Sequence, residues 1–484
     1  MKMIKLVNMR KCLVWSMVAM LSVGFMSCSD EEDNDNKTPV LEDDAPTVVA
    51  SSGFYVANED WLGHDNGTVN YFKNDGSIVY RAYRAANEGE TFGVTTEFAT
   101  IYGDYAYFVS KQGNRLVVAD AKTLKKKAVF TDIGGDGRSF VGIDDKIGYI
   151  GYNGGVRKFD IKTLTLGDPI KGVTGQIGSM CYANGYVFAV SNNKVYVINV
   201  STGEITKTLE GSFNTLTRSK DGMVWIAASA NFIKMNPVTL EQESVDYPKG
   251  VSVSGSWGAW NAGSLCASTQ KNVLYWAKGT SWSSTAIVKY DIDTKAFTDD
   301  FYKLGKDEGN VQLAFYGAGF RVDPISDNLI LTVKRDGWGN SGSFNWIHIL
   351  KADGSIEKKI VLKGDNGTAD GFAGAGDGNY YWFPAIPFFE DANKPQILTN
   401  QILVAPGESK TIDLNEKIVD ADNTSASIIR TVEFAENDLV TYTLKDNILT
   451  VTAKEKTGNT ECTVIAISNG VRVEKKVRVD VAMN

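Results

Sequence analysis

Hydrophobic and polar residues alternate along short stretches of the chain, and each stretch ends in a polar turn. Between residues 105 and 130, alternating runs at 105–109 and 115–119 lead into a turn at 120–123, and another run follows at 127–130. Alternation with a period of two, bounded by Gly, Asn and Asp, predicts antiparallel strands. No convincing amphipathic helix interrupts this pattern, so the sequence predicts an all-β protein.

The polar turn recurs along the chain with a spacing near forty residues. In each copy an Asn or Asp precedes a Thr or Ser, and its side chain is expected to accept a hydrogen bond from backbone two residues on, which closes a tight turn. The copies begin at Asn74, Asp120, Asp160, Asn199, Asn236, Asp291 and, in degenerate form, Ala352. Four-stranded units of this length, repeated radially, are typical of a β-propeller, and seven turns predict seven blades. Eight blades and an open β-solenoid are the alternatives.

The domain boundaries follow from the two ends of the repeat. The first repeat begins at residue 54 without a first strand of its own, while residues 371–385 supply extra strand sequence. We therefore expect N- and C-terminal segments to share a closing blade, with the propeller spanning residues 52–391. Residues 395–484 lack Trp and contain short strands at sandwich-like spacing, which predicts a C-terminal immunoglobulin-like β-sandwich.

The N-terminus predicts export and lipid anchoring. Residues 1–27 combine a basic start with an apolar run at 13–25 that is too short for a comfortable membrane span, and a small residue precedes Cys28. This pattern resembles a bacterial lipoprotein signal peptide, with Cys28 as the lipidated first residue of the mature chain; an ordinary secretory signal is the alternative. An acidic run at 29–33 resembles the surface-export signal of Bacteroides-type lipoproteins. We expect residues 28–51 to form an acidic disordered tether and the protein to face the cell exterior from the outer membrane.

Composition excludes several classes of function. Acidic residues outnumber basic ones by 58 to 50, and by 58 to 46 once residues 1–27 are removed, so a nucleic-acid partner is not expected. Two histidines and three scattered cysteines beyond Cys28 do not suit a histidine metal centre or a disulfide framework. Residues 420–423 read Asp-Ala-Asp-Asn, which is compatible with calcium, although we interpret them as a plain acidic loop. The sequence predicts no metal, no cofactor and no catalytic residues.

Tryptophans in long, Gly- and Ser-rich loops are the candidate ligand contacts. In a propeller, the loops between the second and third strands of a blade emerge on the same face as the loops that join successive blades. That geometry places five tryptophans on one face: Trp61, Trp257, Trp260, Trp282 and Trp338. With Arg335 beside Trp338, they suit a large amphipathic ligand or a sugar. Other tryptophans, at 225, 276, 346 and 382, fall within strands and are expected in the core.

Several short motifs resemble one known family. They are Tyr55–Glu59, Gly67–Phe72, Ala99–Gly103 and Tyr381–Ala385. Together with the export signal, they are similar to Bacteroides-type surface lipoproteins with a YncE-like propeller, and in particular to the BtuG group. The family pattern has Gly where Asp60 stands here, and the C-terminal sandwich is an addition to it.

The resemblance implies that the protein captures corrinoids such as cobalamin and passes them to a TonB-dependent outer-membrane transporter. It also implies that Asn58 and Glu59 belong to the ligand-binding motif. Two other functions remain open: binding of a glycan or another nutrient at the cell surface, and a structural or adhesion role. An enzyme is not expected.

Overall fold

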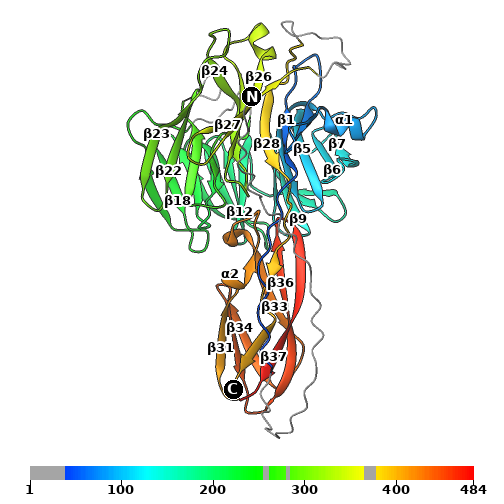
Figure 1. The fold of residues 1–484 in the computed structure, drawn as a ribbon, viewed down its shortest axis with the longest axis vertical. Coiled ribbons are helices and arrows are strands. Elements are labelled where there is room, and N and C mark those ends of the chain that lie inside the picture. The colour runs from blue at the N-terminus through cyan, green and yellow to red at the C-terminus, as the bar shows by residue number, and fades with distance from the viewer. Residues whose placement is uncertain (1–38, 254–260, 280–283, 365–377, 484) are drawn as a thin grey trace, which may run out of the picture. The chain divides into compact units, whose positions relative to one another are not determined.

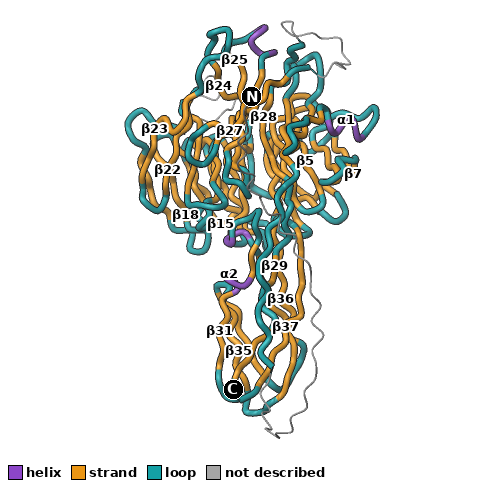
Figure 2. The backbone as a smooth tube through the Cα atoms, in the orientation of Figure 1, coloured by secondary structure: helices purple, strands orange, loops and turns teal. Residues whose placement is uncertain are grey.

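The computed structural model describes residues 39–253, 261–279, 284–364 and 378–483. Within these ranges strands dominate, and helices are confined to short segments, namely α1 (Ala82–Ala86), α2 (Leu414–Lys417) and the 3-10 turns η1 (Gly339–Ser343) and η2 (Ser425–Ser427) (Figure 2). None of the described helices is long and apolar enough to cross a membrane. The all-β prediction is confirmed.

Seven four-stranded antiparallel sheets form between residues 53 and 389 (Figure 1). Sheet 1 contains β28 (Pro384–Phe389), β1 (Gly53–Asn58), β2 (Thr68–Lys73) and β3 (Ile78–Val79). Sheet 2 contains β4 (Val94–Tyr102), β5 (Tyr105–Gln112), β6 (Leu116–Asp120) and β7 (Lys126–Phe130). Sheet 3 contains β8 (Gly137–Gly142), β9 (Ile147–Tyr152), β10 (Gly155–Asp160) and β11 (Thr165–Pro169).

The remaining four sheets of this region follow the same order along the chain. Sheet 4 contains β12 (Ile177–Ala183), β13 (Tyr186–Ser191), β14 (Lys194–Asn199) and β15 (Ile205–Glu210). Sheet 5 contains β16 (Phe213–Arg218), β17 (Val224–Ala228), β18 (Asn231–Met235) and β19 (Gln242–Asp246). Sheet 6 contains β20 (Cys266–Ala267), β21 (Val273–Ala277), β22 (Ala286–Asp291) and β23 (Ala296–Lys303). Sheet 7 contains β24 (Leu313–Val322), β25 (Leu329–Arg335), β26 (Asn345–Leu350) and β27 (Ile356–Leu362).

The recurring polar turn closes the last hairpin of each of these sheets. Asp120 Oδ1, for example, accepts hydrogen bonds from the backbone N–H groups of Lys122 and Thr123. Equivalent bonds are accepted by Asp75, Asp160, Asn199, Asn236, Asp291 and Asp353. The predicted turn chemistry is confirmed in all seven copies, with Asp75 rather than its neighbour Asn74 as the acceptor in the first.

Each sheet buries both faces against its neighbours. In β5, Tyr107 and Val109 pack in a cluster with sheet 3, whereas Ala106 and Phe108 pack with sheet 1. Similar clusters join every successive pair of sheets, and one cluster unites Phe54 and Val56 of sheet 1 with residues of sheet 7. This packing gives a propeller-like fold, in which both faces of an inner strand are apolar.

Sheet 1 is assembled from the two ends of the region. Strand β28 pairs antiparallel with β1, with Tyr55 opposite Phe388 and Val56 opposite Pro387. The expected sharing of one sheet by N- and C-terminal segments is present, with β28 beginning at Pro384. Residues 371–377, for which further strand was expected, lie outside the described residues.

The C-terminal residues form three further sheets around a separate core. One pairs β29 (Gln396–Ile397) with β32 (Ile418–Val419). The second has the order β30 (Gln401–Val404), β37 (Val471–Val481), β36 (Gly458–Ser468) and β33 (Ile429–Phe434). The third has the order β31 (Ser409–Asp413), β35 (Ile448–Ala453) and β34 (Val440–Lys445). Their shared apolar cluster contains no residue of sheets 1 to 7.

Part of the predicted disordered tether is ordered, which corrects that prediction for residues 41–49. The backbone N–H groups of Leu41, Thr47 and Val49 donate to the side chains of Gln401, Gln396 and Asn393 at 2.7–2.8 Å. Salt bridges join Asp43 to Lys417 and Asp44 to Lys475. The acidic residues that suggested a solvated tether therefore pair with lysines of the C-terminal sheets. Cys28 and the acidic run lie outside the described residues.

Candidate functional site

The direction of the strands defines two ends for sheets 1 to 7. The loop end carries the connections between second and third strands and those between successive sheets. The turn end carries the remaining hairpins. Long connections at 59–67, 80–93, 304–312 and 336–344 all belong to the loop end.

A buried acidic centre lies at the loop end, where three strands meet. Glu59 directly follows β1, Glu97 lies in the first half of β4, and Tyr316 lies in the first half of β24. The Tyr316 hydroxyl donates a hydrogen bond to Glu59 Oε2. All three residues are buried, with exposed fractions of 9% for Glu59, 5% for Glu97 and 6% for Tyr316. We call these three residues the acidic centre.

The two carboxyl groups of this centre share one environment. Burial, followed by repulsion from Glu59, raises the pKa of Glu97 well above its usual value, against the opposing effect of Lys111 and Arg138. Glu97 Oε2 is buried and accepts no hydrogen bond. Two close, buried carboxyl groups cannot both ionise without a large cost, so the protonated form of Glu97 is favoured. The centre can therefore both donate and accept hydrogen bonds.

The loop at 59–67 is fixed by a second polar network. Asp65 binds Arg81 at 2.6 Å and Arg84 at 2.7 Å, and all three side chains are at most 21% exposed. Asp60 accepts hydrogen bonds from Thr68 Oγ1 at 2.5 Å and from Tyr380 Oη at 3.0 Å. Both acids are thus tied to structure rather than left open to a ligand.

Asp60 has an unusual backbone conformation for a residue other than glycine. Its φ is +57°, in the left-handed region that glycine adopts most easily. Aspartate tolerates this region better than most residues, and here its two hydrogen bonds hold it in place. Asp60 therefore combines a left-handed backbone with a fully buried carboxyl group.

The predicted site residues have different environments. Asn58 is fully buried and donates to Thr68 Oγ1 at 3.0 Å. Trp61 is half-buried, and its ring lies 4.1 Å from the ring of Tyr381 and 4.0 Å from that of His64. Trp338 is 72% exposed. Trp257, Trp260 and Trp282 lie outside the described residues.

Arg335 lines a separate cavity on sheet 7. It forms a salt bridge with Asp307 at 2.6 Å, and its guanidinium carbon lies 3.6 Å from the centre of the Phe344 ring. The cavity has a volume of ≈ 490 Å³. Buried His348 also faces it; burial, then Lys359, lowers the pKa of His348 to about 4, so its ring is neutral.

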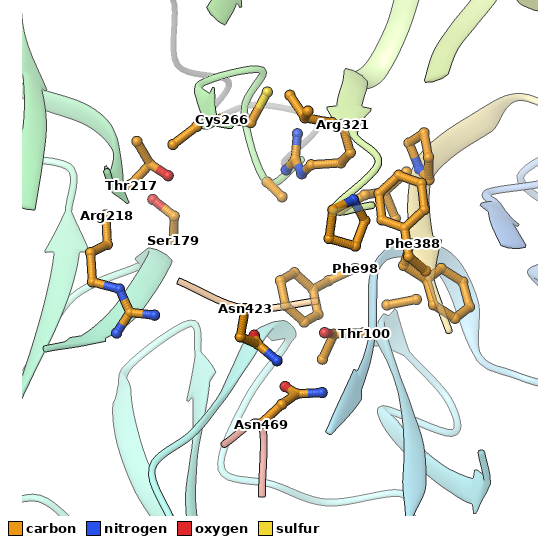
Figure 3. A pocket seen from close by; sticks show the side chains of 18 of the residues that line it. Phe98, Thr100, Ser179, Thr217, Arg218, Cys266, Arg321, Phe388, Asn423 and Asn469 are labelled. Carbon is orange, nitrogen blue, oxygen red and sulfur yellow. The ribbon is translucent and has the colours of Figure 1, made fainter. Parts of the chain in front are cut away.

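Another cavity lies among the inner strands of the sheets (Figure 3). Its volume is ≈ 370 Å³, and its lining includes Phe98, Ser179, Arg321 and Phe388 from four different sheets. Asn423 and Asn469, from the C-terminal residues, line it as well. At the turn end, Gly103 N donates to Asn469 O at 2.7 Å and Gln270 Nε2 donates to Ala421 O at 3.4 Å. The turn end is therefore in contact with C-terminal residues.

Sequence reasoning missed Glu97 and Tyr316. Both lie within strands, whereas the sequence prediction was drawn from tryptophans in loops. The sequence signal for such a centre is a charged residue inside an inner strand. Glu97 in 94–102 and Arg138 in 137–142 are examples. The predicted core tryptophans are buried at 225, 276 and 382, whereas Trp346 is only partly buried.

The chain resembles known proteins over the region of sheets 1 to 7. A family model described as a domain of unknown function (DUF5074) matches residues 52–390. No curated protein sequence matches the chain.

Two solved structures match part of the chain. One is a quinonprotein alcohol dehydrogenase-like protein from Bacteroides thetaiotaomicron, with a TM-score of 0.50 and 19% identity over 64% of this chain and 76% of that chain. The other is a streptogramin B lyase, with a TM-score of 0.43 and 10% identity over 62% of this chain and 88% of that chain. At 19% identity the first likeness supports the propeller-like fold alone.

Proposed function

We propose that this chain, which belongs to the DUF5074 family of domains of unknown function, is a binding protein that captures a small-molecule ligand at its loop end. One observation carries the proposal: the acidic centre of Glu59, Glu97 and Tyr316 lies at the end of the sheets that also bears Trp61 and Trp338. Buried polar groups flanked by aromatic rings are the usual composition of a small-molecule site. No catalytic function is needed for this role.

Contacts at the turn end also favour the loop end as the ligand-binding face. Residues 421 and 469 already bond to turns there, at Gln270 and Gly103. The C-terminal residues therefore cover part of the turn end, and a ligand approaching from solvent has freer access to the loop end.

A corrinoid is the ligand that we propose first. The short motifs around Tyr55–Glu59 and Tyr381–Ala385 resemble the corrinoid-capturing group, and a corrinoid carries many amide side chains around a large ring. Amide N–H groups are suitable donors to a carboxyl pair such as Glu59 and Glu97. Delivery to a TonB-dependent transporter is part of this proposal.

A glycan is the second candidate, supported by Trp338. Its indole is 72% exposed and lies in a loop containing glycine and serine. An exposed aromatic face of this kind can stack on a sugar ring.

For the architecture, we propose that sheets 1 to 7 are the blades of a closed seven-bladed propeller. The hydrophobic cluster between sheets 7 and 1 supports closure, because it joins Phe54 to Ile347 across the two ends of the series. We further propose that residues 395–484 form an immunoglobulin-like sandwich, on the basis of their antiparallel sheets and shared core.

For location, we propose anchoring through lipidated Cys28 at the outer membrane, with the protein facing outward. Replacing Cys28 with Ala should release the protein from membranes. Replacing the acidic residues at 30–33 with Ala should leave it membrane-bound but protected from protease added to whole cells. Full protease accessibility of that variant would show that the acidic run is only a spacer.

Calorimetric titration of the mature protein with cyanocobalamin and with a glycan panel tests the binding function. We expect saturable binding to one ligand class and a loss of at least tenfold in affinity for Glu59→Gln. Glu210→Gln, at a residue whose side chain is 67% exposed in sheet 4, is the matched control and should bind normally. Binding of neither ligand class, or equal binding by both variants, would contradict the proposed site.

A further inference from the structure

Three carboxylates meet in a second place, away from the acidic centre; Asp420 and Asp422 are buried and Asp391 is partly buried. Asp391 follows β28, whereas Asp420 and Asp422 follow β32. One carboxylate oxygen from each residue lies within 4.8 Å of the other two. Asp420 is 9% exposed and Asp422 is 6% exposed, so this cluster is not an ordinary solvated acidic loop.

The negative charge of this cluster lacks a cationic partner among the described residues. Its hydrogen-bond donors are neutral: Asn393 donates its backbone and side-chain N–H groups to Asp422 at 2.5 and 3.0 Å, and Asn469 donates to Asp391 at 2.9 Å. Buried carboxylates without a counter-charge are costly. Burial, with added repulsion from Asp420 and Asp422, raises the pKa of Asp391 to about 8.

Two buried oxygens, one in the cluster and one beside it, are left without hydrogen bonds. One is Asp391 Oδ1. The other is the hydroxyl of Ser468, a residue that is only 1% exposed. Burial raises the pKa of Asp420, and the Ser468 hydroxyl beside it opposes that rise. No hydrogen bond of ordinary geometry joins this hydroxyl to any described residue. Such unsatisfied oxygens in a native structure call for a partner.

We propose that Asp391, Asp420 and Asp422, with the Ser468 hydroxyl, bind a divalent calcium ion. The donor set consists of oxygen alone, which hard cations prefer and which does not suit zinc. Calcium binds oxygen at 2.3–2.6 Å, so two of its ligands can be up to about 5 Å apart. The 4.8 Å limit within the cluster fits that span.

A bound calcium ion would connect segments that are distant in the sequence. It would hold residues 391–393 against the loop at 420–422. Asn393 also accepts a hydrogen bond from Val49 N at 2.7 Å and donates to Val49 O at 2.9 Å. The ion would therefore stabilise the attachment of the N-terminal segment to the C-terminal sheets, a role independent of ligand capture at the loop end.

Titration of the metal-free, full mature chain with CaCl₂ and separately with MgCl₂ tests this site. We expect one calcium ion per chain, weaker binding of magnesium, and a rise in melting temperature of about 5 °C in saturating calcium compared with EDTA. Absence of both calcium binding and the melting shift in the wild-type chain would overturn the proposal. This titration requires no variant, so it does not depend on the folding of any substituted chain.

Two substitutions locate the site. Asp420→Asn and Asp422→Asn should each weaken calcium binding at least tenfold and remove the calcium-dependent melting shift. In EDTA we expect no loss of melting temperature from Asp420→Asn, because it removes like-charge repulsion. Asp438→Asn, in the same C-terminal region but with a side chain that is 71% exposed, is the control and should bind calcium normally. Wild-type calcium affinity in both cluster variants would overturn the assignment.

Discussion

At the scale of single residues, Glu97 is distinguished by being both buried and close to a second carboxyl group. Its exposed fraction is 5%, and Glu59 is the charged neighbour that most strongly raises its pKa after burial itself. A folded-state pKa above the unfolded value means that the folded chain binds the proton more tightly. The stability that protonated Glu97 contributes is therefore present in acid. It is lost as the pH rises above 4.5, the usual pKa of a glutamate, and through the higher folded-state pKa.

Glu97→Gln should remove this pH dependence. We expect the variant to gain stability relative to the wild type between pH 5 and pH 8, by about 1 kcal/mol or more at the higher pH. Thermal unfolding at several pH values measures the difference. Glu210→Gln is the control, and parallel wild-type and Glu97→Gln curves would show that the pair does not hold a proton.

Two tryptophans illustrate opposite roles for one side chain. Trp338 is 72% exposed, so Trp338→Ala should leave the melting temperature unchanged while weakening ligand binding roughly thirtyfold, as expected for loss of an aromatic anchor of about 2 kcal/mol.

Trp225 is 1% exposed, and its Nε1 donates to Ser219 Oγ at 3.0 Å. Trp225→Ala should lower the free energy of unfolding by about 3 kcal/mol or more through a core cavity. Denaturant unfolding and calorimetric titration separate the two effects, and unaltered affinity in Trp338→Ala would make this residue incidental.

At the scale of elements, the loop at 59–67 owes its shape to ionic contacts rather than to regular structure. Asp65 connects this loop to Arg81, which precedes α1, and to Arg84 within it. Burial opposes ionisation of Asp65, but the hydrogen bonds and charges of Arg84 and Arg81 outweigh it and lower its pKa. This contribution to stability is therefore present above pH 3.8 and is lost as the pH falls through the lower folded-state pKa.

Asp65→Asn should loosen the loop at neutral pH. We expect a loss of about 3 kcal/mol in the free energy of unfolding, because two arginines lose a largely buried partner. Ligand affinity should fall as well, since Glu59 and Trp61 belong to this segment. Urea unfolding measures the first effect; a matched change at Asp438, whose side chain is 71% exposed, should have almost none. Equal stability of Asp65→Asn and the wild type would show that backbone hydrogen bonds alone hold the loop.

At the scale of the whole molecule, the C-terminal sheets have their own hydrophobic cluster, and sheets 1 to 7 are joined by a continuous series of others. Two different truncations are therefore expected to have different consequences. A chain ending at residue 392 retains β28 and all seven sheets of the propeller-like region. A chain ending at residue 370 loses β28, which exposes an edge of β1.

The chain ending at residue 392 should fold, remain soluble and bind ligand, whereas the chain ending at residue 370 should aggregate because β1 is left with an unpaired edge. Size-exclusion chromatography and ligand titration of the two fragments provide the measurement. A soluble, ligand-competent fragment ending at residue 370 would contradict the role of β28 in completing sheet 1.

The local features of this fold were determined by the sequence itself. Alternation and the Asx turns predict the strands and hairpins because both depend on neighbours within a few residues, as the bonds accepted by Asp120 and Asp160 confirm. The shared first sheet also followed from a repeat that lacks one strand. Composition alone disfavoured nucleic acid as a partner.

Only the tertiary structure decided which distant residues meet. Glu59 and Tyr316 are 257 positions apart, and Asp391 lies in a different segment from Asp420. No local sequence pattern predicts that either pair of residues lies close together. The same holds for residues 41–49, whose acidic composition suggested a free tether until Lys417 and Lys475 of the C-terminal region were found beside them. Charge pairing and burial depend on the packed chain, whereas turns and strands depend on the sequence nearby.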